Sequence, residues 1–371
     1  MTQQIPLVDL SLQTTEVELE VTEGIAEVIR SGAFVLGPKV VEFESAYAAF
    51  CGVPHCVGVG NGTDAIELAL RGAGVGAGDD VIIPANTFVA TAEAVLRSGA
   101  NLVLADCDED FLLDPGRVAE SVTPQTRAVI GVDLYGQIAP FEALAEVLPS
   151  DVVLMEDAAQ SQGATRHSVS AGAFGVAAAT SFYPGKNLGA FGDAGAVTTS
   201  DDEIADRVRS LRSHGGQRRY EHALLGTNSR LDSIQAVALS AKLRRLVDWN
   251  KQRSEAADRY AQLLANVPGI RLPRAIEGNT HVWHLYVVRV PQRDRVLDYL
   301  LQAGIGAGLH YPTPINLLPP FAHLGLDAGS FPIAERLADE ILSLPIFPGI
   351  SVSQQDRVVE VLLDALAHVA R

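Results

Sequence analysis

Several features are scarce in this chain, and each scarcity argues against a class of protein. Only three residues are cysteines, Cys51, Cys56 and Cys107, and their odd number and spacing favour reduced thiols in a cytoplasmic protein over disulfides or a metal site. No apolar run reaches the roughly 18 residues of a membrane span, and the acidic N-terminal region does not read as a signal peptide. Basic residues number 28 against 45 acidic ones, and the net charge of −17 argues against general nucleic-acid binding.

The length and the spacing of apolar segments predict an α/β fold in two domains. A chain of 371 residues exceeds an ordinary single core, so we expect one large and one small domain. Amphipathic helical stretches alternate with short apolar strands, and this alternation predicts a mostly parallel sheet buried on both faces. The expected strands are 81–83, 102–104, 128–132, 152–155, 178–182 and 194–199, with helices near 62–72, 88–98 and 139–148.

We place the domain boundary near residue 250, inside a long helical stretch over about 232–265 that contains no glycine or proline. The large domain then covers 1–250 and the small C-terminal α+β domain covers 251–371, and the N-terminal segment could join the small domain. The small domain is expected to begin with a β-rich segment at 282–290. Its expected helices lie near 293–303, 331–343 and 353–369.

One lysine stands apart from all other charges. Lys186 lies in the run SFYPGKNLG (181–189), and the nearest charged residues are Arg166 upstream and Asp193 downstream. Lysines normally sit in solvated, charge-rich surfaces. A desolvated amine has a lowered pKa and becomes a nucleophile for aldehydes, which is the requirement for a Schiff base.

An acidic residue ends a buried strand upstream of this lysine. Asp157 follows the apolar segment 152–155 and Glu156. A carboxylate in that position is the partner that a pyridinium nitrogen needs. Lys186 and Asp157 together indicate a site for pyridoxal phosphate (PLP).

Two further segments fit the binding of this cofactor. Residues 60–65 join a short apolar strand to an amphipathic helix, and free N–H groups with the Thr63 hydroxyl at a helix start suit a phosphate. Residues 84–88 place the Phe88 ring at the carboxyl end of strand 81–83, where ligands of α/β proteins bind.

With these motifs, and with the segment GTNSRLD (226–232), the chain resembles the DegT/DnrJ/EryC1/StrS family of PLP-dependent sugar aminotransferases. The resemblance covers nearly the whole chain, from 5–10 and 37–38 to 310–312 and 342–345, with the motifs in family-like order and spacing. It implies PLP-dependent fold type I, which is aspartate aminotransferase-like, with a mostly parallel seven-stranded sheet and a smaller C-terminal α+β domain.

The resemblance also implies a role for each candidate residue. Lys186 would carry the cofactor, and Asp157 would keep its ring nitrogen protonated. Read without the resemblance, His310 and Tyr311 fit the core of the small domain as well. The implied cofactor-binding residues are Gly62, Thr63 and Ser181 at the phosphate, Phe88 on the ring face, Gln160 at O3′ and Asn228, and the implied substrate-binding residues are Tyr183, Arg219, Arg230, His310 and Tyr311.

In the family the loop 226–232 crosses a dimer interface, so the resemblance implies a homodimer with shared active sites. Asn228 would reach the partner's cofactor phosphate, and Arg230 would reach the substrate's phosphates. The expected reaction is a ping-pong transfer of an amino group from L-glutamate to a nucleotide-linked ketosugar, in which the freed Lys186 amine moves a proton.

The sequence leaves the substrate open. Residues 213–220 resemble members that use UDP-linked 3-keto sugars, whereas 181–186 resemble members that use dTDP-linked 3-keto-6-deoxy sugars, and both favour amination at C3. Gln162 stands where many family members have histidine. Asn316 stands where several of the C3-specific members have histidine. The alternatives are a C4-ketosugar or keto-inositol aminotransferase and a non-catalytic regulatory or binding protein. A sugar 3-dehydratase of this fold is disfavoured because a histidine replaces the lysine there.

Overall fold

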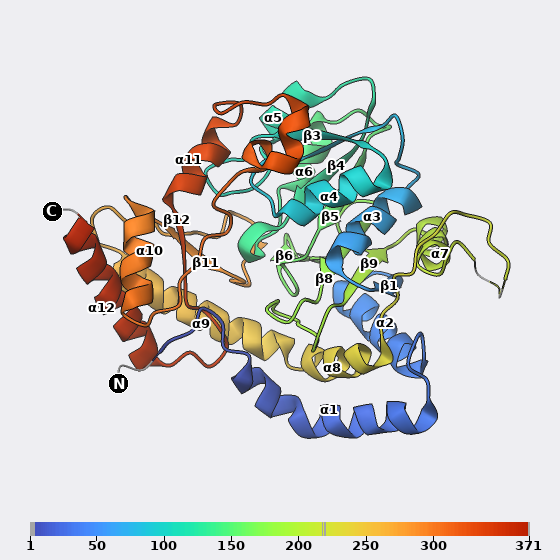
Figure 1. The fold of residues 1–371 in the computed structure, drawn as a ribbon, viewed down its shortest axis with the longest axis horizontal. Coiled ribbons are helices and arrows are strands. Elements are labelled where there is room, and N and C mark those ends of the chain that lie inside the picture. Colours follow the sequence, from blue (N-terminus) through green and yellow to red (C-terminus); the bar gives the residue numbers. More distant parts are fainter. Residues whose placement is uncertain (1–3, 217, 219, 370–371) are drawn as a thin grey trace.

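A computed structural model describes residues 4–216, 218 and 220–369 of the chain (Figure 1). In this described part, no helix is both long enough and apolar enough to cross a membrane. The α-helices are α1 (Ser11–Ser31), α2 (Pro38–Cys51), α3 (Gly62–Gly72), α4 (Val89–Ser98), α5 (Pro115–Ser121), α6 (Phe141–Val147), α7 (Asp202–Leu211), α8 (Ser233–Leu243), α9 (Leu246–Leu264), α10 (Arg293–Gln302), α11 (Pro332–Glu340) and α12 (Val352–Val369). Short 3-10 helices are η1 (Leu134–Gly136), η2 (Ile315–Leu317) and η3 (Pro319–Leu324). The strands are β1 (His55–Val59), β2 (Asp80–Pro84), β3 (Asn101–Ala105), β4 (Thr126–Val132), β5 (Val153–Asp157), β6 (Thr165–Arg166), β7 (Val169–Ser170), β8 (Ala177–Ser181), β9 (Gly195–Thr199), β10 (Asn279–Thr280), β11 (Tyr286–Arg289) and β12 (Ile341–Leu344).

Seven of these strands form one sheet in the order β1–β9–β8–β5–β4–β2–β3. The strands from β8 to β3 are parallel to one another, and β9 runs antiparallel to both of its neighbours. The prediction of a mostly parallel seven-stranded sheet is therefore confirmed. Because β1 has the direction of β8, the carboxyl ends of β1, β2, β4, β5 and β8 meet at one edge, where α/β sheets bind their ligands.

Helices cover both faces of the sheet (Figure 1). Helices α3, α4 and α7 pack on one face, while α2 with α8, and α5 with α6, pack on the other. The side chains of β2 show why: Val81 and Ile83 pack into the first layer, whereas Ile82 packs with Val118 and Leu144 in the second. Successive strand residues point to opposite faces, so a strand covered on both sides is apolar throughout.

The C-terminal part of the chain builds a second, smaller core. β11 pairs antiparallel with β12, and α9, α10 and α12 pack around this pair. The N-terminal segment contributes to it, because Ile5 pairs with Ile305 and is buried in the same cluster. Helix α9 contributes to three buried clusters, through Leu246 beside α2 and α8, through Trp249 beside α1, and through Tyr260 beside β11. The division near residue 250 stays a prediction.

Two details of the predicted helices are wrong. The helix expected over 331–343 ends at Glu340, and Ile341–Leu344 forms β12. These residues are buried and pair with β11, so strand pairing decides the conformation of an apolar run that periodicity alone leaves ambiguous. The long helix expected over 232–265 is interrupted at Arg244 and Arg245, between α8 and α9, where no glycine or proline marks the break.

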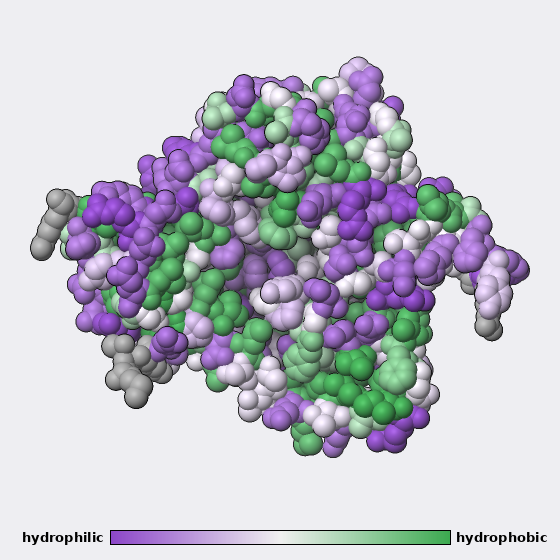
Figure 2. Space-filling model, in the orientation of Figure 1, coloured by the Kyte–Doolittle hydropathy of each residue, from purple (hydrophilic) through white to green (hydrophobic). Residues whose placement is uncertain are grey.

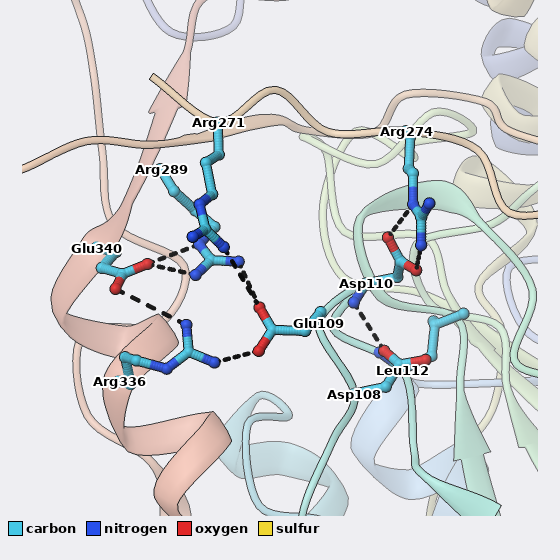
Figure 3. Close-up of polar contacts among 9 residues, drawn as sticks. All are labelled: Asp108, Glu109, Asp110, Leu112, Arg271, Arg274, Arg289, Arg336 and Glu340. Carbon is cyan, nitrogen blue, oxygen red and sulfur yellow. Dashed lines mark hydrogen bonds and ion pairs between the residues drawn. The ribbon is translucent and has the colours of Figure 1, made fainter. Parts of the chain in front are cut away.

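A network of ion pairs joins the C-terminal part to the loop that follows β3 (Figure 3). Glu109 in that loop accepts hydrogen bonds from Arg289 of β11, at 2.8 Å, and from Arg336 of α11. Arg289 also binds Glu340 at 2.7 Å, and Arg274 binds Asp110 with both ends of its guanidinium, at 2.8 and 2.6 Å. The hydrogen bond from Arg289 is the largest of the effects that lower the pKa of Glu109.

Candidate active site

A cavity of about 420 Å³ opens at the carboxyl edge of the sheet. Its walls come from the start of α3, the segment between β2 and α4, the end of β5, the loop after β8 and the C-terminal segment around residue 310. Leu7 and Val8 of the N-terminal segment also line it. Of the residues predicted from the sequence, the cavity brings together Gly62, Thr63, Phe88, Asp157, Gln160, Ser181, Tyr183, Lys186, His310 and Tyr311.

Lys186 lies on a short loop that leaves β8 and returns to β9. The loop is closed by the Ala190 N–H, which donates to the Phe182 carbonyl at 2.8 Å, and Lys186 N–H donates to the Tyr183 carbonyl at 2.8 Å. The Phe182 ring anchors the loop because it is buried edge-on against Phe43 of α2. Desolvation in the cavity lowers the pKa of the Lys186 amine to about 8, although the Asp157 carboxylate raises it. The site therefore holds an amine that deprotonates more readily than an exposed lysine.

Asp157 ends β5 and is 5% exposed. Its carboxylate accepts hydrogen bonds from the Thr91 hydroxyl at 2.9 Å and from the Ala159 N–H at 3.1 Å. Burial raises the pKa of Asp157, against these hydrogen bonds and the attraction of Lys186. A protonated ring nitrogen would compensate the buried charge, so the residues present fit a pyridinium partner.

The start of α3 forms a cradle for an anion. Asn61 caps the helix by accepting from the Asp64 N–H at 2.8 Å, so Asn61 and not Thr63 is the capping side chain. This cap leaves the N–H groups of Gly62 and Thr63 free to hold a ligand. Gly62 packs closely on Ser181, since a Cβ at Gly62 would lie 2.5 Å from the Ser181 Cβ.

Gln160 and Tyr311 form one wall of the cavity. The Gln160 carbonyl oxygen accepts from the Tyr135 N–H at 2.7 Å, and its amide nitrogen donates to the Tyr311 hydroxyl at 3.1 Å. The Phe88 and Tyr311 rings lie 5.0 Å apart between centroids. His310 shares a hydrogen bond of 2.8 Å with Ser343, and desolvation lowers its pKa to about 4, so its imidazole is neutral at pH 7.

Some residues of the site were missed by sequence reasoning. Thr91 of α4 is hydrogen bonded at 2.8 Å to Thr87, which lies four residues earlier, just before the helix, and this spacing could have indicated it. His284 also lines the cavity and shares a hydrogen bond of 3.2 Å with Asn187, and desolvation is the main cause that lowers its pKa. No local motif in the sequence marks His284.

Gln162, flagged for its departure from the family pattern, lies beneath the site. Its amide nitrogen donates to the Thr180 hydroxyl at 2.9 Å and to the Ser181 carbonyl at 3.0 Å. Gln162 thus fixes the carboxyl end of β8 through these two hydrogen bonds. Asn316, flagged for the same reason, is hydrogen bonded to Glu335 at 3.1 Å instead of lining the cavity.

Two predicted residues lie outside the cavity of their own chain. Asn228 and Arg230 belong to the long segment between α7 and α8, whose middle part projects from the body of the molecule in Figure 1. The two residues lie where the segment has returned to the body, since Ser229 between them accepts from the Gly60 N–H at 2.9 Å and donates to Asp64 at 2.7 Å. Arg219, the third, lies outside the residues that the structure describes. Among the described residues that line the cavity, Lys186 is the one lysine or arginine. For an anion, the described lining therefore offers the Lys186 amine and the N–H groups at the start of α3.

An amine of lowered pKa beside a buried aspartate, at the carboxyl edge of this sheet and next to an anion cradle, defines an enzyme that works through a Schiff base with an aldehyde cofactor. The chain belongs to the DegT/DnrJ/EryC1/StrS aminotransferase family, whose model matches residues 16–363. The resemblance found in the sequence is thereby confirmed, and the protein is an aminotransferase.

Of the similar proteins, one carries a regulatory name and another the name of a transaminase. The chain is 45% identical to the erythromycin biosynthesis sensory transduction protein EryC1 of Saccharopolyspora erythraea, over 96% of this chain and 98% of that one. It is 44% identical to the dTDP-3-amino-3,4,6-trideoxy-alpha-D-glucose transaminase of Streptomyces venezuelae, over 97% and 95%. The crystal structure of S. venezuelae DesV in complex with a ketimine intermediate superposes with a TM-score of 0.95, at 44% identity and over 98% of each chain.

Gly62→Ala tests the anion cradle. The added Cβ would meet the Ser181 Cβ at 2.5 Å, so one of the two segments must shift. Overpacking of this kind costs about 1–3 kcal/mol of free energy. If the cradle must shift to relieve it, we expect the affinity for PLP to fall by roughly tenfold or more. The measurement is an absorbance titration of the cofactor-free protein with PLP. Gly76→Ala is the matched control, because its Cβ would make an ordinary contact at 3.5 Å. Unchanged affinity in Gly62→Ala would contradict the cradle.

Proposed function

We propose that this protein transfers an amino group from L-glutamate to C3 of a dTDP-linked 3-keto-6-deoxyhexose. The observation that carries the proposal is the Lys186 amine of lowered pKa, beside buried Asp157, in a cavity of about 420 Å³. The choice of nucleotide and sugar is supported by the similar transaminase of S. venezuelae, whose name specifies a dTDP-linked 3-amino sugar.

Each wall of the cavity has a part in this reaction. PLP supplies an aldehyde for the amino group and a ring that withdraws electrons from the reacting carbon. Lys186 would hold the cofactor through that aldehyde, and its amine, when free, would take a proton from the α carbon of the donor and give one back when the ketosugar is aminated. Asp157, oriented by Thr91, would keep the ring nitrogen protonated. Gly62, Thr63 and Ser181 would hold the phosphate.

Apart from Lys186, the described residues that line the cavity include no lysine or arginine. A ketosugar joined to a nucleotide carries a diphosphate, and glutamate carries two carboxylates. We propose that the protein is a homodimer in which Asn228 and Arg230 of each subunit complete the partner's site. Exposed apolar residues support such an interface: Ile29, Phe34, Val35 and Val41 lie on or between α1 and α2, and Figure 2 shows apolar side chains gathered over this region.

A cytoplasmic location is proposed because all three cysteines are free and buried.

Arg230→Ala tests the substrate and the shared site together. A charge-assisted hydrogen bond to phosphate contributes about 1.5–3 kcal/mol, so kcat/KM for the sugar nucleotide should fall by roughly 10- to 100-fold. The glutamate half-reaction, followed by absorbance, should change far less because glutamate has no diphosphate. Arg357→Ala, which removes an arginine paired on the surface with Glu360, is the control. Equal losses in both half-reactions, or equal use of a keto-inositol, would contradict the proposed substrate.

Subunit mixing separates a shared site from an independent one. Lys186→Ala subunits and Asn228→Ala/Arg230→Ala subunits are each expected to be deficient alone. Mixed dimers contain one intact site and should recover activity. Sedimentation of an active monomer, or the absence of recovery, would show that each subunit is complete by itself.

A further inference from the structure

A second lysine is buried near the active-site loop without a role in the reaction. Lys242 of α8 is 3% exposed and forms no ion pair with any residue that the structure describes. Its Nζ donates to the Gly189 carbonyl at 2.7 Å and lies 4.6 Å from the centroid of the Phe191 ring. Desolvation alone lowers its pKa to about 8. Lysines are almost never fully buried unless paired, so this position calls for a reason.

The Gly189 carbonyl belongs to the return arm of the loop that carries Lys186. This loop is closed between Phe182 and Ala190 by the hydrogen bond described above. The outgoing arm of the loop, at Pro184, and the return arm, at Gly189, are in close contact, because a Cβ at Gly189 would lie 2.2 Å from the Pro184 carbonyl oxygen. A shift of Gly189 therefore displaces Pro184 and, with it, the backbone of Lys186.

Other contacts hold the same loop at different points. Gln235, two helical turns before Lys242 on α8, accepts from the Phe191 N–H at 2.8 Å. Asn187, next to Lys186, donates to Asn250 of α9 at 2.9 Å and to the Val282 carbonyl at 3.0 Å. Lys242 supplies the one charged contact of this set.

We propose that Lys242 is a positioning residue for Lys186, and that its ammonium group fixes the return arm by binding the Gly189 carbonyl beneath the Phe191 ring. The inference rests on the role of Lys186 given under the proposed function. An apolar residue of the same length would leave the carbonyl without its donor and would lose the cation–π contact, so packing alone does not account for a lysine here. Proton transfer depends steeply on the placement of the reacting amine, and a displacement of about 1 Å can slow it on the order of 100-fold.

The test compares Lys242→Met with Lys251→Met in the complete, cofactor-loaded protein. Methionine keeps the length of the side chain and removes its charge and donors. Lys251 is the control, because its side chain is 75% exposed and its ion pair with Glu255 spans 3.8 Å. We expect Lys242→Met to lower kcat of the glutamate half-reaction by about 10- to 100-fold, with KM for glutamate changed less than about twofold. The isotope effect with α-deuterated glutamate should increase, because proton transfer becomes slower.

A purely structural role makes a different prediction. It would lower the melting temperature, while the folded protein would keep the wild-type kcat and isotope effect, and that result would overturn the proposal. If Lys242→Met does not fold, Lys242→Gln retains a donor for Gly189 and is measured in the same way; if neither variant folds, Lys242 is a stability residue and the proposal fails. Lys186→Ala is measured in parallel. Turnover in that variant would refute the role of Lys186, whereas an inactive Lys186→Ala beside a normal Lys242→Met would refute the Lys242 inference alone.

Discussion

Lys186→Ala is expected to abolish amino transfer and the visible absorbance of the bound cofactor. Among the described residues lining the cavity, Lys186 is the one lysine, so no other amine there can form the Schiff base. The measurement is single-turnover absorbance with glutamate, beside Lys251→Ala as a control with intact activity. A Lys186→Ala protein that turns over without added amine would mean that another residue carries the cofactor.

The pH dependence of cofactor loading follows from the same residue. The pKa of about 8 means that the Lys186 amine is mostly protonated at pH 7 and mostly neutral at pH 9. The neutral form is the nucleophile, so the rate at which the cofactor-free protein takes up PLP should rise between these values and then level off. A midpoint near 10.5 would show that the amine is not desolvated.

Asp157→Asn should retain PLP and lose most of its activity. Asparagine is close in size to aspartate, but it carries no charge to keep a ring nitrogen protonated. Removal of one such electrostatic partner commonly costs about 10²- to 10³-fold in kcat, and we expect a loss of that order. Asp151→Asn is the matched control, since its side chain is 70% exposed two residues before β5. Near-normal turnover in Asp157→Asn would show that a different carboxylate faces the ring.

The parts of the site that could be predicted are those whose chemistry is written in a short segment. Lys186 is recognisable because its flanking residues lack charge, and Asp157 because it ends an apolar strand. His284 reaches the cavity through packing between segments far apart in the chain, so no local pattern indicates it, whereas Thr91 has only its spacing from Thr87 as a local signal. Asn228 and Arg230 were assigned by family resemblance, and their expected partner lies in a second subunit.

The same distinction applies to the fold. The strands of the large sheet are predictable because their central residues are buried on both faces and therefore mostly apolar. The sequence predicts helix at β12 because its three apolar residues, Ile341, Leu342 and Leu344, continue the pattern of α11, and only pairing with β11 decides between the two conformations. The break at Arg244 and Arg245 has no sequence marker, since both residues favour helices.

The ion pairs around Glu109 lie outside the cavity, between the C-terminal part that supplies one of its walls and the loop that follows β3. Lys186 and Asp157 are held by the sheet and its apolar layers, which salt does not screen. His310 and Tyr311 belong to the C-terminal part, which is tied to the loop after β3 by partly exposed charges (Figure 3). Attraction between exposed charges weakens as ionic strength rises. The C-terminal wall is therefore joined to the rest of the molecule in two ways: by ion pairs that salt weakens, and by apolar packing that salt does not screen, since Leu285, Val287 and Leu337 lie in the buried cluster of the large sheet. Rising ionic strength should loosen only the first of these contacts, and with it the grip on the substrate before the chemistry at Lys186.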